Sequence, residues 1–200
     1  DEKLMYIIGL LSGDGHLRYT KKGKYVTTII FSNSDKEVIN LYKKYVEDLF
    51  NIKDIKQTGK YDYYFSSPAI GNFLSNLGIP YNNKSKTLSV PNYLVFLPDD
   101  LVSSYLKGLY DTDGYVHLPK SGKQIIYYTM SKNMANSLRM LLLRFEILSN
   151  VRRKKDGTYE ISINEKKSID IFKEKIQLNH TERKLRLNKE IKTKYTKNSY

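Results

Sequence analysis

Two stretches of the chain repeat one pattern: YIIGLLSGDGHL covers residues 6–17, and YLKGLYDTDGYV covers residues 105–116. In each, an apolar run contains Gly-Leu and ends on Asp-Gly, at Asp14 in the first copy and at Asp113 in the second. The runs are apolar on nearly every side, which is typical of a buried helix. The pattern therefore predicts two buried helices that each end at a carboxylate.

Both predicted helices carry small residues on one face. Gly9 and Gly13 are four residues apart, and Gly108 and Thr112 repeat that spacing in the second helix. Residues at this spacing share one face of a helix, and a face of small residues lets another backbone approach closely. We expect these four residues to form the interface between the two helices.

This packing would place Asp14 and Asp113 side by side, with Gly15 and Gly114 in the left-handed conformation that often ends a helix. A carboxylate there is disfavoured, because the helix end already carries a partial negative charge. A divalent cation would compensate, and two carboxylates with backbone carbonyls and waters suit magnesium. Such metals facing a phosphodiester can hydrolyse it.

The repetition continues beyond the two motifs. Each copy is followed by a turn, a helix that opens at a serine, a second turn between strand-like runs and another short helix. The predicted fold class is α+β, with two pseudo-symmetric αββαββα repeats and antiparallel sheets. The repeats are placed at residues 1–97 and 98–200, because prolines interrupt the chain in PNYLVFLPDD. The paired positions are Gly23 and Gly122 for the first turn, Ser34 and Ser131 for the helix start, and Gly59 and Gly157 for the second turn.

Composition favours a nucleic-acid partner. The 200 residues include 34 Lys and Arg against 21 Asp and Glu, so the net charge of +13 attracts polyanions. The positive charges are spread along the chain among 18 tyrosines, which argues against a membrane surface. The lack of cysteine excludes disulfides, zinc-thiolate sites and cysteine nucleophiles. We expect an intracellular protein, in a compartment that the sequence does not specify.

The nine-residue cores of the two motifs, IIGLLSGDG at 7–15 and LKGLYDTDG at 106–114, resemble the LAGLIDADG motif of homing endonucleases in their monomeric two-repeat form. The resemblance implies that the motif helices form a pseudo-dimer interface. It also implies that Asp14 and Asp113 bind metal, with the carbonyls of Gly13 and Thr112 as further ligands. The two sheets would form a saddle in the DNA major groove, and both strands would be cut to leave short 3′ overhangs.

The same resemblance implies auxiliary catalytic groups. The family often places a lysine near the scissile phosphates after the last helix of a repeat, and Lys84 stands there. In the second repeat Thr181 falls at the corresponding spacing, so Arg183 or Lys184 is expected to substitute. A polar residue at the end of the second strand often orients water, and Asn33 suits that role.

The two repeats depart from each other at two other positions. Met130 occupies the place that corresponds to Asn33 and cannot orient water. Ser12 replaces the inner aspartate of the motif, which the second repeat keeps as Asp111, a position that is usually structural. These departures predict an asymmetric active site.

The strand that follows each motif alternates, which predicts a DNA-facing side. His16, Arg18 and Thr20 share one side of the first strand, and Tyr115 and His117 point outward in the second. Solvated surface charge is the alternative for each lysine, and unequal offsets from the aspartates argue against catalysis by the two histidines. The hairpins supply the remaining predicted contacts, Lys22, Lys24, Lys56, Lys60, Lys120, Lys123, Arg152, Arg153 and Lys154.

The sequence thus favours a magnesium-dependent, site-specific double-strand DNA endonuclease that acts as a monomer. Mn²⁺ is expected to replace Mg²⁺, and Ca²⁺ to support binding without cleavage. An intron RNA maturase on the same fold is the main alternative, and a DNA-binding regulator is a third. Both aspartates favour cleavage, since a protein that only binds has no use for a repulsive carboxylate pair. The basic tail is expected to be partly helical over residues 182–195.

Overall fold

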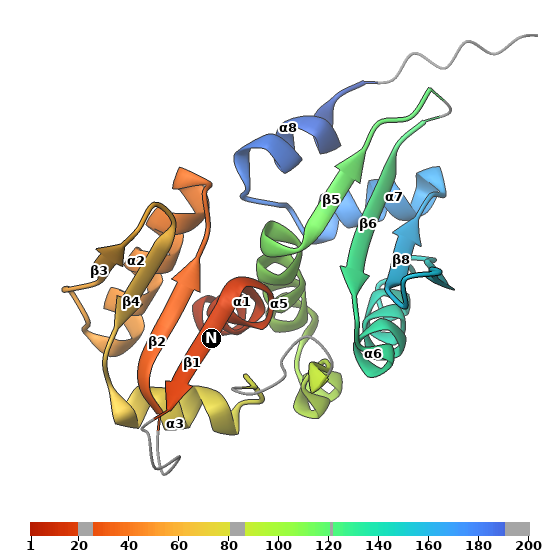
Figure 1. The fold of residues 1–200 in the computed structure, drawn as a ribbon. Coiled ribbons are helices and arrows are strands. Elements are labelled where there is room, and N and C mark those ends of the chain that lie inside the picture. The colour runs from red at the N-terminus through yellow and green to blue at the C-terminus, as the bar shows by residue number, and fades with distance from the viewer. Residues whose placement is uncertain (20–25, 81–86, 121, 191–200) are drawn as a thin grey trace, which may run out of the picture.

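The computed structural model describes residues 1–19, 26–80, 87–120 and 122–190. Two motif helices, α1 and α5, lie at the centre, and a four-stranded antiparallel sheet lies on either side of them (Figure 1). The strand orders, β1-β2-β4-β3 and β5-β6-β8-β7, correspond strand for strand. The predicted fold class, with its two repeats and its packed motif helices, is confirmed.

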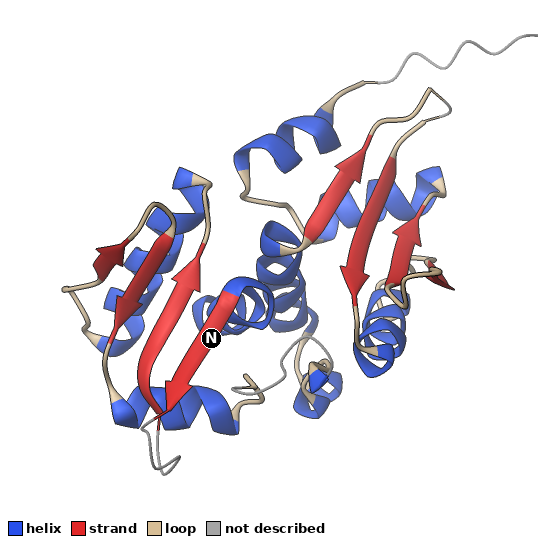
Figure 2. Ribbon diagram, in the orientation of Figure 1, coloured by secondary structure: helices blue, strands red, loops and turns tan. Residues whose placement is uncertain are grey.

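The first repeat follows the predicted order of elements. Among its described residues, the strands form two hairpins, and helices alternate with them (Figure 2). The elements are α1 (Glu2–Asp14), β1 (Gly15–Tyr19), β2 (Val26–Ser32), α2 (Lys36–Phe50), β3 (Lys56–Thr58), β4 (Asp62–Phe65) and α3 (Pro68–Asn76).

The second repeat has the same order and one additional helix. A 3-10 turn, η1 (Asn92–Phe96), lies in the proline-containing connection before it. The elements are α5 (Asp99–Thr112), β5 (Gly114–His117), β6 (Gln124–Thr129), α6 (Lys132–Leu143), β7 (Asn150–Arg153), β8 (Tyr159–Ile163), α7 (Lys166–Lys175) and α8 (Thr181–Asn188).

One face of each sheet is buried against helices. Leu17 in β1 and Val116 in β5 are 1% exposed, whereas the side chains next to them along each strand are exposed, as the alternation predicts. Phe31 of β2 packs on Tyr42 of α2, with ring centroids 4.5 Å apart. The opposite faces of β1 and β5 therefore remain open to a partner.

Small residues allow α1 and α5 to touch backbone to backbone. A Cβ on Gly9 would overlap the Tyr105 carbonyl and lie 2.9 Å from Leu109 N. In the reciprocal position, a Cβ on Gly108 would lie 2.8 Å from Leu10 N. Real Cβ atoms essentially never come this close, so glycine is required at both positions.

The conformation predicted for the glycines after the aspartates is wrong. Gly15 is extended, with φ −86° and ψ 153°, and Gly114 opens strand β5 without a positive φ. Each helix instead passes straight into a strand that turns back over its last turn. A Cβ on Gly15 would lie 2.5 Å from Leu11 Cα, and one on Gly114 would lie 2.9 Å from Tyr110 Cα. Close approach, rather than a left-handed turn, explains both glycines.

The predicted serine cap is correct in one repeat and wrong in the other. Ser131 Oγ accepts from Met134 N at the start of α6. In the first repeat the cap of α2 is Asp35, whose Oδ1 accepts from Val38 N, and not Ser34. Both residue types are good N-caps, so the choice between neighbours depends on the wider structure.

Within the described ranges, no helix has the length and hydrophobicity that a membrane span requires.

Candidate active site

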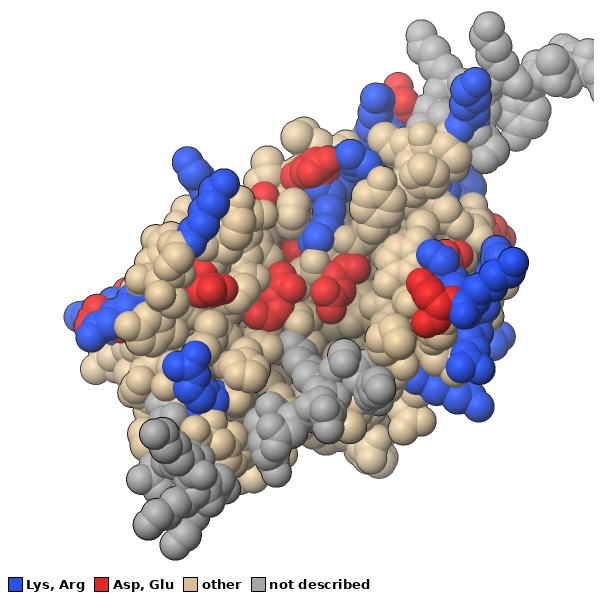
Figure 3. Space-filling view, in the orientation of Figure 1, with Lys and Arg blue, Asp and Glu red and all other residues tan. Residues whose placement is uncertain are grey.

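Asp14 and Asp113 stand at the ends of the two packed helices. Asp14 is the last residue of α1, and Asp113 directly follows α5. Both are half-buried. Asp113 reaches towards the first repeat. Its Oδ2 lies 3.3 Å from the position that a Cβ on Gly13 would occupy. In the space-filling view, acidic side chains gather in the middle of this face, and Lys and Arg lie around them (Figure 3).

The two carboxylates have different hydrogen-bond donors. Asn33 Nδ2 donates to Asp14 Oδ2 at 2.9 Å. Tyr127 OH donates to Asp113 Oδ2 at 3.3 Å. Burial, reinforced by Asp113, raises the pKa of Tyr127 well above its ordinary value, so the hydroxyl keeps its proton and remains a donor. The structure thus gives Asp14 an amide donor in Asn33 and Asp113 a hydroxyl donor in Tyr127, and the role of Asn33 in orienting water stays a prediction.

Arg183 is the basic residue that lies against the end of α5. Its Nη2 donates to the Thr112 carbonyl at 2.6 Å, and its Nη1 donates to the carbonyls of Tyr110, at 3.2 Å, and Asp111. Burial lowers the pKa of Arg183, and the nearby carboxylates, including Asp14 and Asp113, oppose that shift. Helix ends leave carbonyls without intrahelical partners, and Arg183 bonds three of them.

Lys184, the residue assigned to this role from the sequence, is exposed on α8. The structure therefore favours Arg183 among the two expected substitutes. The spacing expected for Thr181 is wrong, because Thr181 follows Asp113 by 68 residues. Arg183 follows Asp113 by 70 residues, as Lys84 follows Asp14, and this spacing was a sequence signal for Arg183.

Asp111 holds the chain segment that carries Arg183. The fully buried carboxylate accepts from Tyr6 OH at 2.8 Å, and its Oδ1 accepts from the backbone N–H groups of Asn179 and His180 at 3.0 and 2.9 Å. Burial raises the pKa of Asp111 to about 6, although these hydrogen bonds and Arg183 oppose the shift. Asp111 therefore joins the first repeat, through Tyr6, to the segment after α7.

Asp35 attaches the same segment to the first repeat. While its Oδ1 caps α2, its Oδ2 accepts from Thr181 N at 3.0 Å, at the first residue of α8. His180 Nδ1 lies 3.5 Å from the same Oδ2. One carboxylate thus caps α2 and also accepts from the first N–H of α8, which belongs to the other repeat. We call residues 177–188, which both Asp35 and Asp111 hold, the C-terminal strap.

The chemistry of the donors suits a hard divalent cation. Asp14 and Asp113 supply carboxylate oxygens, and the helix ends supply carbonyls, including that of Thr112. Among the described residues there is no group of three or more His, Cys, Asp and Glu that could hold a metal. Carbonyls and waters would therefore have to complete the coordination, which is usual for Mg²⁺.

A hollow of about 470 Å³ lies beside Asp113, between the end of α1 and strand β6. Gly13, Asp113, Tyr127 and Met130 are among its lining residues. The site therefore opens on one side toward the second sheet. Met130 accepts a weak hydrogen bond on its thioether from Thr158 Oγ1 at 3.5 Å.

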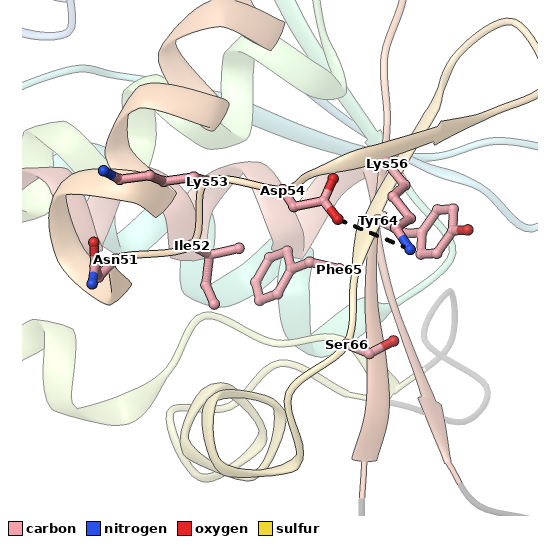
Figure 4. Close-up of a pocket in the computed structure, with 8 residues that line it drawn as sticks. All are labelled: Asn51, Ile52, Lys53, Asp54, Lys56, Tyr64, Phe65 and Ser66. Carbon is pink, nitrogen blue, oxygen red and sulfur yellow. Dashed lines mark ion pairs between the residues drawn. The ribbon is translucent and has the colours of Figure 1, made fainter.

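A second hollow, of about 380 Å³, lies at the outer edge of the first sheet (Figure 4). It is formed by β3, β4 and the chain after α2, far in sequence from either aspartate. Lys56 Nζ lies 3.9 Å from Asp54 Oδ2, a solvent-exposed pair that is worth little energy. Lys56 remains available to a polyanion at this edge.

The structure exposes most of the predicted DNA contacts that it describes. His16 and Arg18 project from β1, and Tyr115 and His117 stack on β5 with ring centroids 6.0 Å apart. Lys123 differs, because its Nζ donates to the Leu187 carbonyl of α8. The other exposed residues are Lys56, Lys60, Lys120, Arg152, Arg153 and Lys154. Thr20, Lys22, Lys24 and Lys84 lie outside the described residues.

Helix α8 packs on strand β5. Arg186 lies over the Tyr115 ring, 5.6 Å from its centroid, and its Nη1 donates to the Val116 carbonyl at 3.4 Å. The predicted helix in the tail is present over Thr181–Asn188 and ends earlier than expected, because Lys189 is extended; the predicted part after residue 190 lies outside the described residues. The helix lies beside β5 (Figure 1).

Comparisons with solved structures show the fold in known proteins. The structure of I-DmoI in complex with DNA and Mn superposes with a TM-score of 0.64 and 16% identity, covering 90% of this chain and 98% of that one. The homing endonuclease I-WcaI bound to its DNA recognition sequence superposes with a TM-score of 0.68 and 16% identity, covering 93% and 85%. At this identity the likeness concerns the fold.

Curated relatives match along only part of their own length. The glutamine–fructose-6-phosphate aminotransferase of Methanocaldococcus jannaschii is 32% identical over 184 residues, which cover 87% of this chain and 16% of that protein. A probable translation initiation factor IF-2 of the same organism is 29% identical over 180 residues, covering 85% and 14%. The chain thus spans about a sixth of these relatives, whose names share no activity.

The profile of the LAGLIDADG-like domain matches residues 1–78 and 100–177, once for each repeat. These ranges contain both motif helices and both sheets. The chain therefore belongs to the LAGLIDADG-like domain family.

Proposed function

We propose that this protein is a site-specific DNA endonuclease that hydrolyses both strands of its target with a divalent metal, Mg²⁺ in the first place. The observation that carries the proposal is the pair of half-buried aspartates at the ends of α1 and α5, between two sheets with exposed basic strands. Two like charges at two helix ends are unfavourable by themselves, so their placement makes sense for cation binding.

Each group in the site has a role in that reaction. Asp14 and Asp113, with the carbonyls of Gly13 and Thr112, would hold the cations. A bound cation activates water and stabilises the leaving oxygen. Asn33 and Tyr127 orient the carboxylates through their hydrogen bonds. The open faces of β1 and β5 hold the duplex, with arginine suited to base edges and lysine to phosphates.

Known structures of similar fold support the partner and the cofactor. I-DmoI has been solved in complex with DNA and Mn or Ca, a variant of it with target DNA in the presence of Mg, and I-WcaI with its recognition sequence. By this likeness the present chain would bind duplex DNA, and Mn²⁺ would replace Mg²⁺. We also propose that it acts as a monomer, with the pseudo-twofold symmetry of its two repeats.

A randomised duplex library tests the proposal. With Mg²⁺ the protein should select and cut a defined site in both strands, whereas Ca²⁺ should support only retention of the same duplex. Asp14→Asn and Asp113→Asn should each lower cleavage by at least about 100-fold, because metal catalysis contributes several kcal/mol. Specific retention without any cut in Mg²⁺ or Mn²⁺ would contradict nuclease activity and favour a binding role.

A further inference from the structure

We propose that Arg183 is a fixed counter-cation of the candidate active site, and that it weakens the binding of a divalent cation at the Thr112 end. This inference rests on the proposed function, since it concerns the metal of that same site. The resemblance to a known motif implied only a basic residue near the phosphates. The structure instead places a guanidinium on a carbonyl that was expected to bind metal.

The contacts of Arg183 are directed at the protein itself. Three successive carbonyls at the end of α5 accept from it, and the bond to Thr112 O is 2.6 Å long. A carbonyl oxygen has two lone pairs, so Thr112 O has room for a metal as well. The guanidinium charge would then lie next to that metal and repel it.

The same charge stabilises the site before metal binds. Asp14 and Asp113 both interact electrostatically with Arg183. The helix end of α5 adds its own partial negative charge. Arg183 therefore neutralises part of the negative charge of the two aspartates and the helix end at all times. A cation that enters the site is attracted less strongly than it would be by the two aspartates alone.

The C-terminal strap holds Arg183 in this place from both sides. Asp111 binds the backbone of Asn179 and His180, and Asp35 of the first repeat binds the backbone of Thr181. Leu187 is 2% exposed and anchors the far end of the strap in the core. Groups on both repeats thus fix the position of the guanidinium at their junction.

Mn²⁺ titration of the whole chain without DNA, followed through the EPR signal of the free ion, tests the inference. Arg183→Gln should bind Mn²⁺ about tenfold more tightly than the wild type, because one nearby positive charge is removed. Lys189→Gln removes the same charge from an exposed residue at the end of α8 and should leave the affinity unchanged. Arg183→Lys should restore the wild-type affinity.

Thermal unfolding supplies a second measurement that does not need cleavage. In EDTA, Arg183→Gln should unfold at a lower temperature than the wild type, and Mn²⁺ should raise its midpoint by more than it raises that of the wild type. Equal or weaker Mn²⁺ binding by Arg183→Gln, in a protein that cuts DNA, would overturn this inference and leave the proposed function intact. No binding by either protein would overturn the inference and would also contradict the metal chemistry.

Discussion

The ends of α1 and α5 carry the same aspartate and the same small packing face, but different surroundings. At the end of α1, Asp14 accepts from Asn33, an amide on the chain after β2. At the end of α5, Asp113 accepts from Tyr127 within strand β6. The duplicated backbone thus fixes where the carboxylates stand, and neighbouring side chains have diverged around them.

A second difference concerns the position two residues before each aspartate. The second repeat has Asp111, which accepts hydrogen bonds from Tyr6 OH and from backbone N–H groups of the strap. The first repeat has the smaller Ser12 at this position. A buried carboxylate can accept several hydrogen bonds, and a serine hydroxyl fewer. This single change gives the second repeat a binding point for the C-terminal strap. The comparison teaches that asymmetry enters through side chains while the fold remains symmetric.

The largest expected effect concerns what the two ends share. Gly9→Ala should lower the free energy of unfolding by more than about 3 kcal/mol, because the new methyl group meets the backbone of Tyr105 and Leu109. Gly59→Ala is the control, since nothing lies within 4 Å of its Cβ and only the strain of φ +61° applies, about 1 kcal/mol. Urea unfolding measures the stability of both variants. Equal losses of stability would contradict the prediction, because they would show that α1 and α5 can move apart to accommodate the methyl group.

The next effect concerns the strap, which Asp35 of the first repeat and Asp111 of the second both hold. Asp35→Ala should cost about 2 kcal/mol of stability, because α2 loses its N-cap and the first N–H of α8 loses its acceptor. Asp35→Asn should cost less, since its amide keeps one acceptor oxygen and can still cap one helix. Ser34→Ala, at the exposed neighbouring residue, is the control and should be near neutral.

The stabilisation that Asp35 provides should depend on pH. Burial alone would raise the pKa of Asp35, but hydrogen bonds from Val38 and Thr181 lower it below its ordinary value of 3.8. A lowered folded-state pKa means that the stabilisation is complete above pH 3.8 and is lost as the pH falls through the folded value. The difference between wild type and Asp35→Ala, measured in urea, should therefore shrink below pH 3.8. A constant difference would show that the charge of Asp35 does not matter.

The smallest effect concerns the two donors to the aspartates. Asn33→Ala should lower the cleavage rate by about tenfold, and Tyr127→Phe by less, because the hydrogen bond at 2.9 Å is shorter than the one at 3.3 Å. Nicked intermediates, resolved strand by strand, provide the measurement. Loss in one strand only for each variant would assign each aspartate to one strand, and an equal loss in both would show that the pair works as one unit.

The sequence by itself determined the repeated architecture, because each of its signals is local. Apolar runs, glycines four residues apart and alternating strands fix which surfaces are buried, and two copies in register predict two matching units. The same local signals placed Asp14 and Asp113 at the two helix ends, where the structure has them. They failed at Gly15, where contact with the preceding helical turn decides the conformation.

Only the tertiary structure decided which groups surround the aspartates. Asp35 and Thr181 are hydrogen-bonded although they are 146 residues apart in the sequence, and Arg183 and Thr112 although they are 71 residues apart. No periodicity connects such residues, because their contact depends on how the two repeats pack and on where the chain returns after α7. A hydrogen bond needs its two atoms within about 3 Å of each other, and only the packed fold brings these pairs that close.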